Sequence, residues 1–306
     1  MPKILVTGAG GLIGHAITSL GLPEMAYLTR KDADLTDFTA TKDVFNVIKP
    51  DKVIHLAAQV GGLGGNMIHS GEYFCNNIMI NINVLEAARL CGVKKLVSFM
   101  STCVFPEACQ YPLNEKDIHN GPPHPSNFGY AYAKRMLEVQ SVAYRKEWGC
   151  DYIVAIPTNA YGPNDNFNLE DGHVIPSLIH KCYLAMKNNT DLVLWGSGKP
   201  LREMVYSKDI AELAIWALEN YSEEYSIILS HGIETSIMDI VDVIVRKIGF
   251  EGRVIFDTTK PEGQFRKPSD TTKLRKYLPK FEFTSIEKGI EETVKWFVSN
   301  YPKIRK

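Results

Sequence analysis

The sequence predicts an α/β fold built around a doubly wound parallel sheet, and three observations support this. Short runs rich in β-branched residues recur along the first half of the chain, and segments of helical character separate them. A glycine-rich turn follows the first of these runs. Strands that alternate with helices are typical of a parallel sheet with helices on both of its faces.

The first element is a strand over KILVTG, residues 3–8, and the turn after it reads GAGGLIG. Gly8, Gly11 and Gly14 follow a G-x-x-G-x-x-G pattern that opens a helical segment. Such glycines let the backbone turn tightly and approach a pyrophosphate, whose charge lies at the helix N-terminus. Glycine-rich turns are common, so this motif is weak alone and gains weight from the alternation that follows it.

The later elements continue this alternation. Further strands are expected over residues 26–29, 52–58, 94–100 and 152–158, and helices over 38–48 and 81–93. We therefore expect a Rossmann-type dinucleotide-binding domain over residues 1–156, with the chain returning to its sheet at about 203–231. A smaller C-terminal α/β domain, residues 157–306, would bind the substrate.

The composition argues against several classes of protein. Apolar residues make up 45% of the 306 residues, charged residues make up 23%, and the formal net charge is −1. General binding to nucleic acid would require a basic excess. No apolar run reaches the roughly 18 residues of a membrane span, and no signal peptide precedes the first strand. We expect a cytoplasmic protein that binds neither nucleic acid nor membranes.

The six cysteines show neither CxxC pairs nor a zinc-binding spacing. They are Cys75, Cys91, Cys103, Cys109, Cys150 and Cys182. In a chain of this size, such scatter indicates reduced thiols and no metal site.

The end of the second expected strand bears on the choice of cofactor. An NAD site typically has an acid there that binds the ribose 2′-hydroxyl, whereas cations suit the 2′-phosphate of NADP. Arg30 and Lys31 stand at this point and favour NADP(H), unless they are only solvated loop charges. Asp32 and Asp34 lie slightly further on and leave NAD open.

Three residues form a candidate reductase site. Tyr130 and Lys134 stand four apart, which places them on one face of a helix, and the ammonium is expected to lower the tyrosine pKa. Pairs at this spacing are common on surfaces, but Ser101 after the fourth strand and the glycine turn weaken that reading. In this order the elements resemble the extended short-chain dehydrogenase/reductase superfamily. The resemblance implies that Ser101 binds the substrate carbonyl, Tyr130 is the general acid, and Lys134 binds the nicotinamide ribose.

Cys103 adds a function that a simple reductase does not need. If residues 101–103 are extended, Cys103 faces the same side as Ser101 and points at the substrate. A thiol beside a ketone is a candidate base for removing an α-proton, which is epimerase chemistry. Epimerisation also requires an acid on the opposite face, and His173 is the candidate because of its natural pKa. His180 is expected to be structural.

A closer resemblance extends from Lys3 to about Phe297. It is carried by STCVFP, HNGPPHPSNFGYAYAKRM, PTNAYGPNDNFN, DGHVIP and WGSGKPLREMVYSKDIA. These segments resemble the GDP-L-fucose synthase family, which combines 3,5-epimerase and NADPH-dependent 4-reductase activities. The resemblance implies GDP-4-keto-6-deoxy-D-mannose as substrate.

The resemblance also implies a set of site residues. The catalytic residues would be Ser101, Cys103, Tyr130, Lys134 and His173. The cofactor would contact Gly8, Gly11, Leu12, Ile13, Gly14, Arg30, Asp34, Leu35, Ala57, Ala58, Tyr130, Lys134, Pro157, Asn159 and His173. The GDP-sugar would contact Asn159, Lys181, Trp195, Arg202, Lys267 and Asp270. The last two lie in a basic loop, residues 260–270, which is a candidate to close over the nucleotide.

Helices over residues 81–93 and 131–147 carry apolar stripes wider than one sheet face requires. In this superfamily the equivalent helices pair two subunits in a four-helix bundle, so we expect a homodimer.

Two other functions remain open from the sequence. One is a nucleotide-sugar 4-epimerase or 4,6-dehydratase of the same fold, although the dehydratases carry an Asp-Glu pair where Cys103 and Val104 stand. The other is a non-catalytic NADP-binding regulator, which would typically have lost the Tyr-x-x-x-Lys pair.

Overall fold

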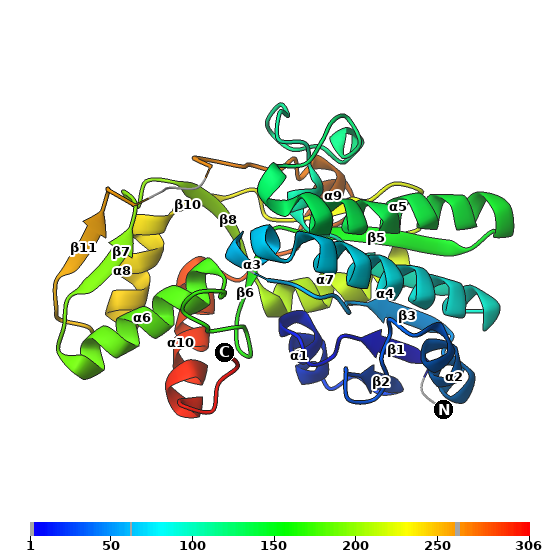
Figure 1. The fold of residues 1–306 in the computed structure, drawn as a ribbon, viewed down its shortest axis with the longest axis horizontal. Coiled ribbons are helices and arrows are strands. Elements are labelled where there is room, and N and C mark those ends of the chain that lie inside the picture. Colours follow the sequence, from blue (N-terminus) through cyan, green and yellow to red (C-terminus); the bar gives the residue numbers. More distant parts are fainter. Residues whose placement is uncertain (1–2, 62, 261–263) are drawn as a thin grey trace.

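The computed structural model describes residues 3–61, 63–260 and 264–306 and contains a six-stranded parallel sheet (Figure 1). The strand order is β2 (Met25–Leu28), β1 (Ile4–Thr7), β3 (Lys52–His55), β4 (Lys95–Phe99), β5 (Asp151–Pro157) and β9 (Ile227–Leu229). The expected α/β class is therefore confirmed. The order reverses direction between β1 and β3, and ligands of open α/β sheets bind beyond the carboxyl ends of the strands at such a point.

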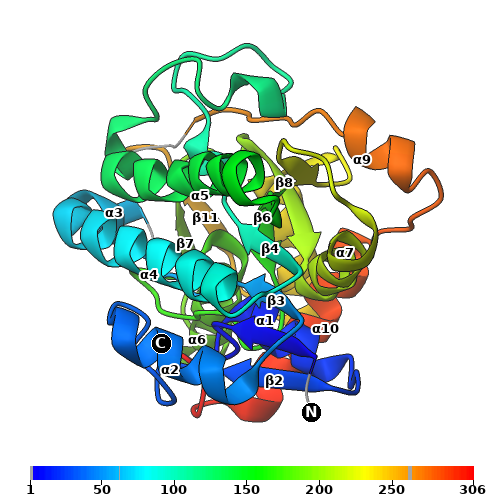
Figure 2. The same ribbon diagram turned by 90° about the vertical axis from the view of Figure 1, so that its right-hand side faces the viewer.

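Helices cover both faces of this sheet. On one face lie α2 (Phe38–Ile48), α4 (Ser70–Leu90) and α5 (Phe128–Trp148), which bury Phe45, Leu85 and Leu137 in the core. On the other face lie α1 (Leu12–Ser19) and α7 (Ser207–Asn220), which bury Ile17 and Ile210. Figures 1 and 2 both show α4 and α5 side by side along the outer surface.

Several elements differ in extent from their sequence-based predictions. β3 ends at His55, three residues early, because the chain leaves the sheet where it meets the glycine turn at Ala57. α4 begins at Ser70, well before the expected start at residue 81. Polar and apolar residues are mixed in its first half, SGEYFCNNIMI, so no single apolar stripe there predicted a helix. By contrast, α2 begins and ends as predicted, because the Asp37 side chain accepts hydrogen bonds from the Thr39 and Ala40 amides.

The second domain is smaller and is built from two short sheets. β8 (Leu201–Tyr206) pairs in parallel with β6 (Asn159–Tyr161) and antiparallel with β10 (Glu234–Ser236), while β7 (Leu192–Trp195) pairs in parallel with β11 (Val254–Asp257). Its helices are α6 (Val174–Asn188), α8 (Ile237–Ile248) and α10 (Ile286–Asn300). They pack around a separate core that includes Phe167, Ile179 and Phe297.

The remaining helices are short. α3 (Leu63–Ile68) precedes α4, and α9 (Thr272–Tyr277) packs beside β9. Within residues 3–61, 63–260 and 264–306, no helix is both long and apolar enough to cross a membrane.

Candidate active site

The segment after β4 places Ser101 and Cys103 together, but not in the way that we expected. Ser101 is extended, with φ −145° and ψ 158°, and residues Thr102–Val104 then form a single 3-10 turn. The turn forms because the Val104 amide donates to the Ser101 carbonyl over 3.1 Å. The prediction that residues 101–103 are all extended is therefore wrong. The Cys103 thiol nevertheless lies close enough to Ser101 for the Ser101 hydroxyl to lower the pKa of the thiol.

Cys103 is partly buried and has two cations nearby. Burial raises the pKa of the thiol, while the Ser101 hydroxyl and the charges of Lys267 and Lys134 act to lower it. The thiol is thus mostly protonated at neutral pH, and two ammonium groups are placed to stabilise its thiolate.

Tyr130 and Lys134 lie on the first two turns of α5, which runs past this segment. Lys134 is only 3% exposed, and its Nζ donates to the Phe99 carbonyl over 2.9 Å. The same Nζ lies 6.0 Å from the centre of the Tyr130 ring. The Phe99 carbonyl at the end of β4 therefore fixes the ammonium close to both Tyr130 and Cys103.

The protonation states of this pair are also set mainly by burial. Desolvation lowers the pKa of Lys134 to about 8, with Cys103 acting in the opposite direction. Burial, together with the charge of Cys103, raises the pKa of Tyr130. The pKa of Tyr130 is therefore raised overall, contrary to the lowered pKa expected from the neighbouring Lys134, because desolvation of the phenol dominates. A protonated Tyr130 suits a general acid.

His173 stands on the second domain, immediately before α6. Its Nδ1 faces Asp165 Oδ1 at 3.5 Å, and 51% of its side chain is exposed. The hydrogen bond to Asp165 raises the pKa of His173. Cys103 follows β4, whereas His173 lies in the loop between β6 and α6, so the two groups come from different elements of the fold. His180 is buried, and its Nδ1 donates to the Phe167 carbonyl over 2.7 Å, a structural role as expected.

The glycine turn fits the pyrophosphate of a dinucleotide. Gly8 has φ 71°, and a Cβ at Gly14 would lie 2.5 Å from Ala9 Cα, so neither position admits a side chain. Gly11 has no side chain to cap α1, and the first amides of that helix are left for a ligand.

The end of β2 is arranged as an NADP site requires. Arg30 and Lys31 are exposed. Both nearby acids instead bind their own turns: Asp32 Oδ2 accepts from the Thr29 amide and hydroxyl, each over 2.7 Å. Asp34 Oδ1 accepts from the Thr36 amide over 2.9 Å and its hydroxyl over 2.7 Å. The hydrogen bonds of Asp32 and Asp34 thus stabilise the turns of this loop.

The other residues expected to contact the cofactor follow the carboxyl ends of the strands. They are Leu12 and Ile13 at the start of α1, Leu35 before α2, Ala57 and Ala58 after β3, and Pro157 at the end of β5.

An exposed tryptophan with lysines beside it lies in the second domain. Trp195 ends β7 and is 66% exposed. The ammonium groups of Lys181 and Lys260 each lie 5.9 Å from the centre of its ring. Arg202 stands on β8, where burial lowers its pKa and its Nη1 donates to the Leu201 carbonyl over 2.7 Å. Trp195 thus offers a flat aromatic face with two ammonium groups beside it.

The loop expected over residues 260–270 reaches the turn after β4 through Lys267. Residues 261–263 of this loop lie outside the described residues. Lys267 Nζ donates to the Thr102 carbonyl over 2.9 Å, beside Cys103. The Asp270 carboxylate accepts from the Thr272 amide and the Asn114 amide group, each over 2.9 Å. Asp270 therefore fixes the loop end, whereas Lys267 lies in the site.

Sequence reasoning missed two buried acids that organise the second domain. Glu203, next to Arg202, is 2% exposed and accepts from the Ser269 amide over 2.8 Å and the Ser230 hydroxyl over 2.6 Å. The Glu203 carbonyl accepts from Asn159 Nδ2 over 2.9 Å. The sequence signal for Glu203 was an acidic residue directly before the apolar run MVY of β8. The other missed acid is Asp165, within the quoted segment GPNDNFN.

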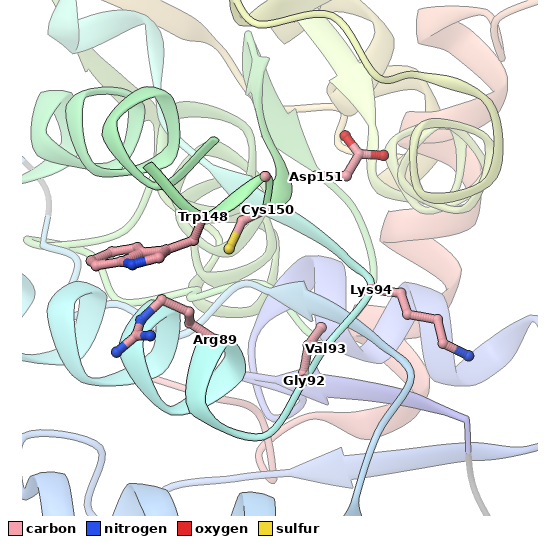
Figure 3. A pocket seen from close by; sticks show the side chains of 8 residues that line it. Arg89, Gly92, Val93, Lys94, Trp148, Cys150 and Asp151 are labelled. Carbon is pink, nitrogen blue, oxygen red and sulfur yellow. The ribbon is translucent and has the colours of Figure 1, made fainter. Parts of the chain in front are cut away.

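A cavity of about 310 Å³ lies away from all of these residues, at the amino ends of β4 and β5 (Figure 3). Its charged groups are paired: Asp151 with Lys95 at 2.8 Å, and Lys94 with Asp51 at 2.9 Å. It contains no group arranged for catalysis. The described residues also hold no cluster of three or more His, Cys, Asp or Glu side chains suited to a metal ion.

The chain belongs to the NAD dependent epimerase/dehydratase family, whose profile matches residues 4–228. It is 49% identical to a GDP-L-fucose synthase of Dictyostelium discoideum, over 99% of this chain and 97% of that protein. It is 33% identical to the GDP-L-fucose synthase of Escherichia coli K12, over 99% and 98% of the two chains. A crystal structure of a GDP-L-fucose synthetase from Naegleria fowleri bound to NADP superimposes with a TM-score of 0.95, at 43% identity over 99% of this chain and 94% of that one.

Proposed function

We propose that the protein is a bifunctional 3,5-epimerase and NADPH-dependent 4-reductase that converts GDP-4-keto-6-deoxy-D-mannose to GDP-L-fucose. The observation that carries this proposal is the position of the Cys103 thiol. It lies close enough to Ser101, Tyr130 and Lys134 for these groups to affect one another's protonation, which supports a base beside a reductase site. The relatives from Dictyostelium discoideum and Escherichia coli support the same activity.

Epimerisation needs one base and one acid on opposite faces of the sugar. The 4-keto group acidifies the protons on C3 and C5, and the Cys103 thiolate removes one of them. The resulting enolate oxygen accepts hydrogen bonds from the Ser101 and Tyr130 hydroxyls. The His173 imidazolium then delivers a proton to the other face of the same carbon, and repetition at the second carbon inverts both centres.

Reduction uses the same carbonyl. NADPH, when bound, supplies the hydride for C4. The Tyr130 hydroxyl is placed to give its proton to the carbonyl oxygen, and Ser101 keeps that oxygen oriented. Lys134 holds positive charge near Tyr130, which stabilises the tyrosinate left after the proton is given. Both reactions thus depend on one polarised carbonyl.

Arg30 and Lys31 would bind the 2′-phosphate of NADP, because Asp32 is bonded to its own turn. We expect a higher kcat/KM for NADPH than for NADH. Arg30→Ala should reduce that preference while leaving the NADH rate unchanged. Equal use of both cofactors by the unaltered enzyme would contradict the assignment.

The second domain would bind the GDP moiety. Trp195 offers a face on which guanine can stack, and the cations Lys181, Arg202 and Lys267 suit the diphosphate. Asn159 would contact the sugar from the start of β6. Asp270 would act indirectly, through the loop that carries Lys267.

The outer faces of α4 and α5 support a homodimer. Their exposed apolar side chains include Phe74, Met79, Ile82, Leu90, Val139 and Trp148. A four-helix bundle between two copies would bury this surface. Ile82→Glu should therefore yield monomers by analytical ultracentrifugation, whereas the control Val47→Glu, at an 81% exposed site on α2, should not. A dimeric Ile82→Glu variant would exclude this interface.

All six cysteines are free thiols in the structure, which supports placing the enzyme in a reducing compartment such as the cytoplasm.

The function is tested by incubating the protein with GDP-4-keto-6-deoxy-D-mannose in D₂O, with and without NADPH, and identifying the sugar by NMR. We expect deuterium at C3 and C5 in both reactions, and GDP-L-fucose only with NADPH. A reduced product without deuterium at these carbons would mean that the protein is a simple reductase. No reaction in either mixture would contradict the whole proposal.

A further inference from the structure

Asp165 is a buried carboxylate to which neither the sequence nor the proposed mechanism assigned a role. Its side chain is 2% exposed, and it lies in the loop between β6 and α6. Oδ1 accepts from the Asn166 amide over 2.7 Å and faces His173 Nδ1 at 3.5 Å. Oδ2 is buried and has no hydrogen-bond partner among the described residues. A carboxylate with an unsatisfied buried oxygen costs stability, so its presence calls for a functional reason.

The loop holds Asp165 rigidly. Asn164, directly before it, adopts a left-handed conformation with φ 65°. Phe167, two residues after it, is fully buried and is fixed at both backbone groups. Its amide donates to the Arg305 carbonyl over 2.9 Å, and its carbonyl accepts from His180 over 2.7 Å. Asp165 therefore meets His173 from a fixed position.

His173 is held on one side and open on the other. Its Nδ1 faces Asp165, while its Nε2 has no partner in the described part of the chain and half of the side chain is exposed. Two charged groups act on the ring: Asp165 from its own loop, and Arg305 from the C-terminal segment that packs against that loop. Nε2 is thus the only ring nitrogen that a substrate can reach.

We propose that Asp165 is the positioning residue of His173. The Asp165 carboxylate accepts a hydrogen bond from the Nδ1–H of His173, and this orients the ring so that Nε2 presents its proton to the sugar carbon. This inference rests on the proposed function. When the imidazolium gives its Nε2 proton to the carbanion carbon, the Nδ1–H remains bonded to Asp165 and the ring becomes neutral. Nε2 then regains a proton from solvent. The carboxylate stays ionised throughout and stabilises the charged form of the ring.

The electrostatics agree with this geometry. The hydrogen bond and the charge of Asp165 raise the pKa of His173, while burial and Arg305 lower it. A raised pKa keeps more of the ring as imidazolium at neutral pH, which is the form that an acid needs.

The test uses the holoenzyme saturated with NADP⁺ and compares Asp165→Asn with the matched control Asp171→Asn, which removes the same charge from an exposed position in the same loop. Asp165→Asn should slow deuterium exchange into C3 and C5 by about 10-fold or more, out of the roughly 10²–10⁴-fold that general acid catalysis supplies. Reduction of the ketone by NADPH should survive. The control should exchange at the wild-type rate.

Two further measurements separate positioning from general damage. In a His173→Gln background, Asp165→Asn should cause no additional loss of exchange, because both changes remove the same acid. A further loss equal to that in the wild-type background would overturn the proposal.

The second measurement is an NMR titration of the imidazole signals, with His173 assigned by its disappearance in His173→Gln. It should give a pKa above about 6.5 in the wild type and a lower one in Asp165→Asn. A wild-type pKa at or below the ordinary value would overturn the proposal without any Asp165 variant. If the wild-type enzyme itself exchanges no deuterium, the proposed function fails instead.

Discussion

The two ends of the six-stranded sheet differ in whether their titratable groups form ion pairs. At the amino ends, the charged residues that line the cavity in Figure 3 form ion pairs. Asp151, for example, pairs with Lys95 at 2.8 Å and with Arg145 at 2.7 Å. At the carboxyl ends, Cys103 and Lys134 carry no ion pair within the described residues, although both lie in desolvating surroundings.

The comparison shows that a hollow does not identify the active site of this protein. Paired charges at the amino ends stabilise the fold modestly and leave nothing to react. Buried, unpaired titratable groups at the carboxyl ends cost stability and have shifted pKa values, which is the common condition of catalytic groups. Variants at the two ends should therefore affect different quantities, namely activity at one end and stability at the other.

The largest effect is expected from Tyr130→Phe. Without its hydroxyl, the oxygen on C4 has no proton donor, so reduction should slow by about 10²–10⁴-fold. NADPH binding, followed by fluorescence titration, should be retained because Lys134 stays bonded to the Phe99 carbonyl. Reduction at a near-normal rate would mean that another group is the acid.

A smaller effect is expected from Trp195→Ala, at the edge of the same site. Stacking of a base on an aromatic ring is worth about 1–3 kcal/mol, so KM for the GDP-sugar should rise by about 5- to 150-fold. Its kcat should change little, since a base stacked on Trp195 would lie far from the reacting carbons of the sugar. Steady-state kinetics with varied GDP-sugar checks this, and a fall in kcat at constant KM would place Trp195 elsewhere in the reaction.

The smallest effect is expected from Lys94→Ala at the amino ends. Lys94 is 76% exposed and pairs with Asp51, and such surface pairs contribute about 1 kcal/mol or less. Urea unfolding should show a change of this size, and kcat/KM should be that of the wild type. A clear loss of activity would show that the cavity in Figure 3 has a function after all.

The sequence predicted the fold well because its signals are local. The glycine turn and the α2 cap at Asp37 each depend on residues close together in the chain. The start of α4 was missed because polar and apolar residues alternate irregularly after Ser70 and form no single apolar stripe. Packing against α5 stabilises α4 instead, and at the start of α4 the Gly129 amide donates to the Ser70 hydroxyl over 3.2 Å.

The candidate site was predictable only in its residue types. Ser101, Cys103, Tyr130 and His173 were recognisable from motifs, but their protonation states were not. Burial depends on the whole fold, and it raises the pKa of Tyr130 where the Tyr–Lys spacing alone suggested a lower one. The contact between Asp165 and His173 likewise depends on how the loop before α6 turns, which no spacing rule encodes.

The central claim is that Cys103 is the base of epimerisation in a pocket that also reduces the ketone. Cys103→Ser keeps the size and hydrogen bonding of the side chain but raises its pKa far beyond the useful range. The measurement is deuterium incorporation at C3 and C5 of GDP-4-keto-6-deoxy-D-mannose in D₂O, read by NMR before and after NADPH is added. We predict that exchange is lost, while the un-epimerised ketone is slowly reduced to a GDP-6-deoxyhexose other than fucose. Exchange at close to the wild-type rate would show that Cys103 only packs in the site and would remove it from the mechanism.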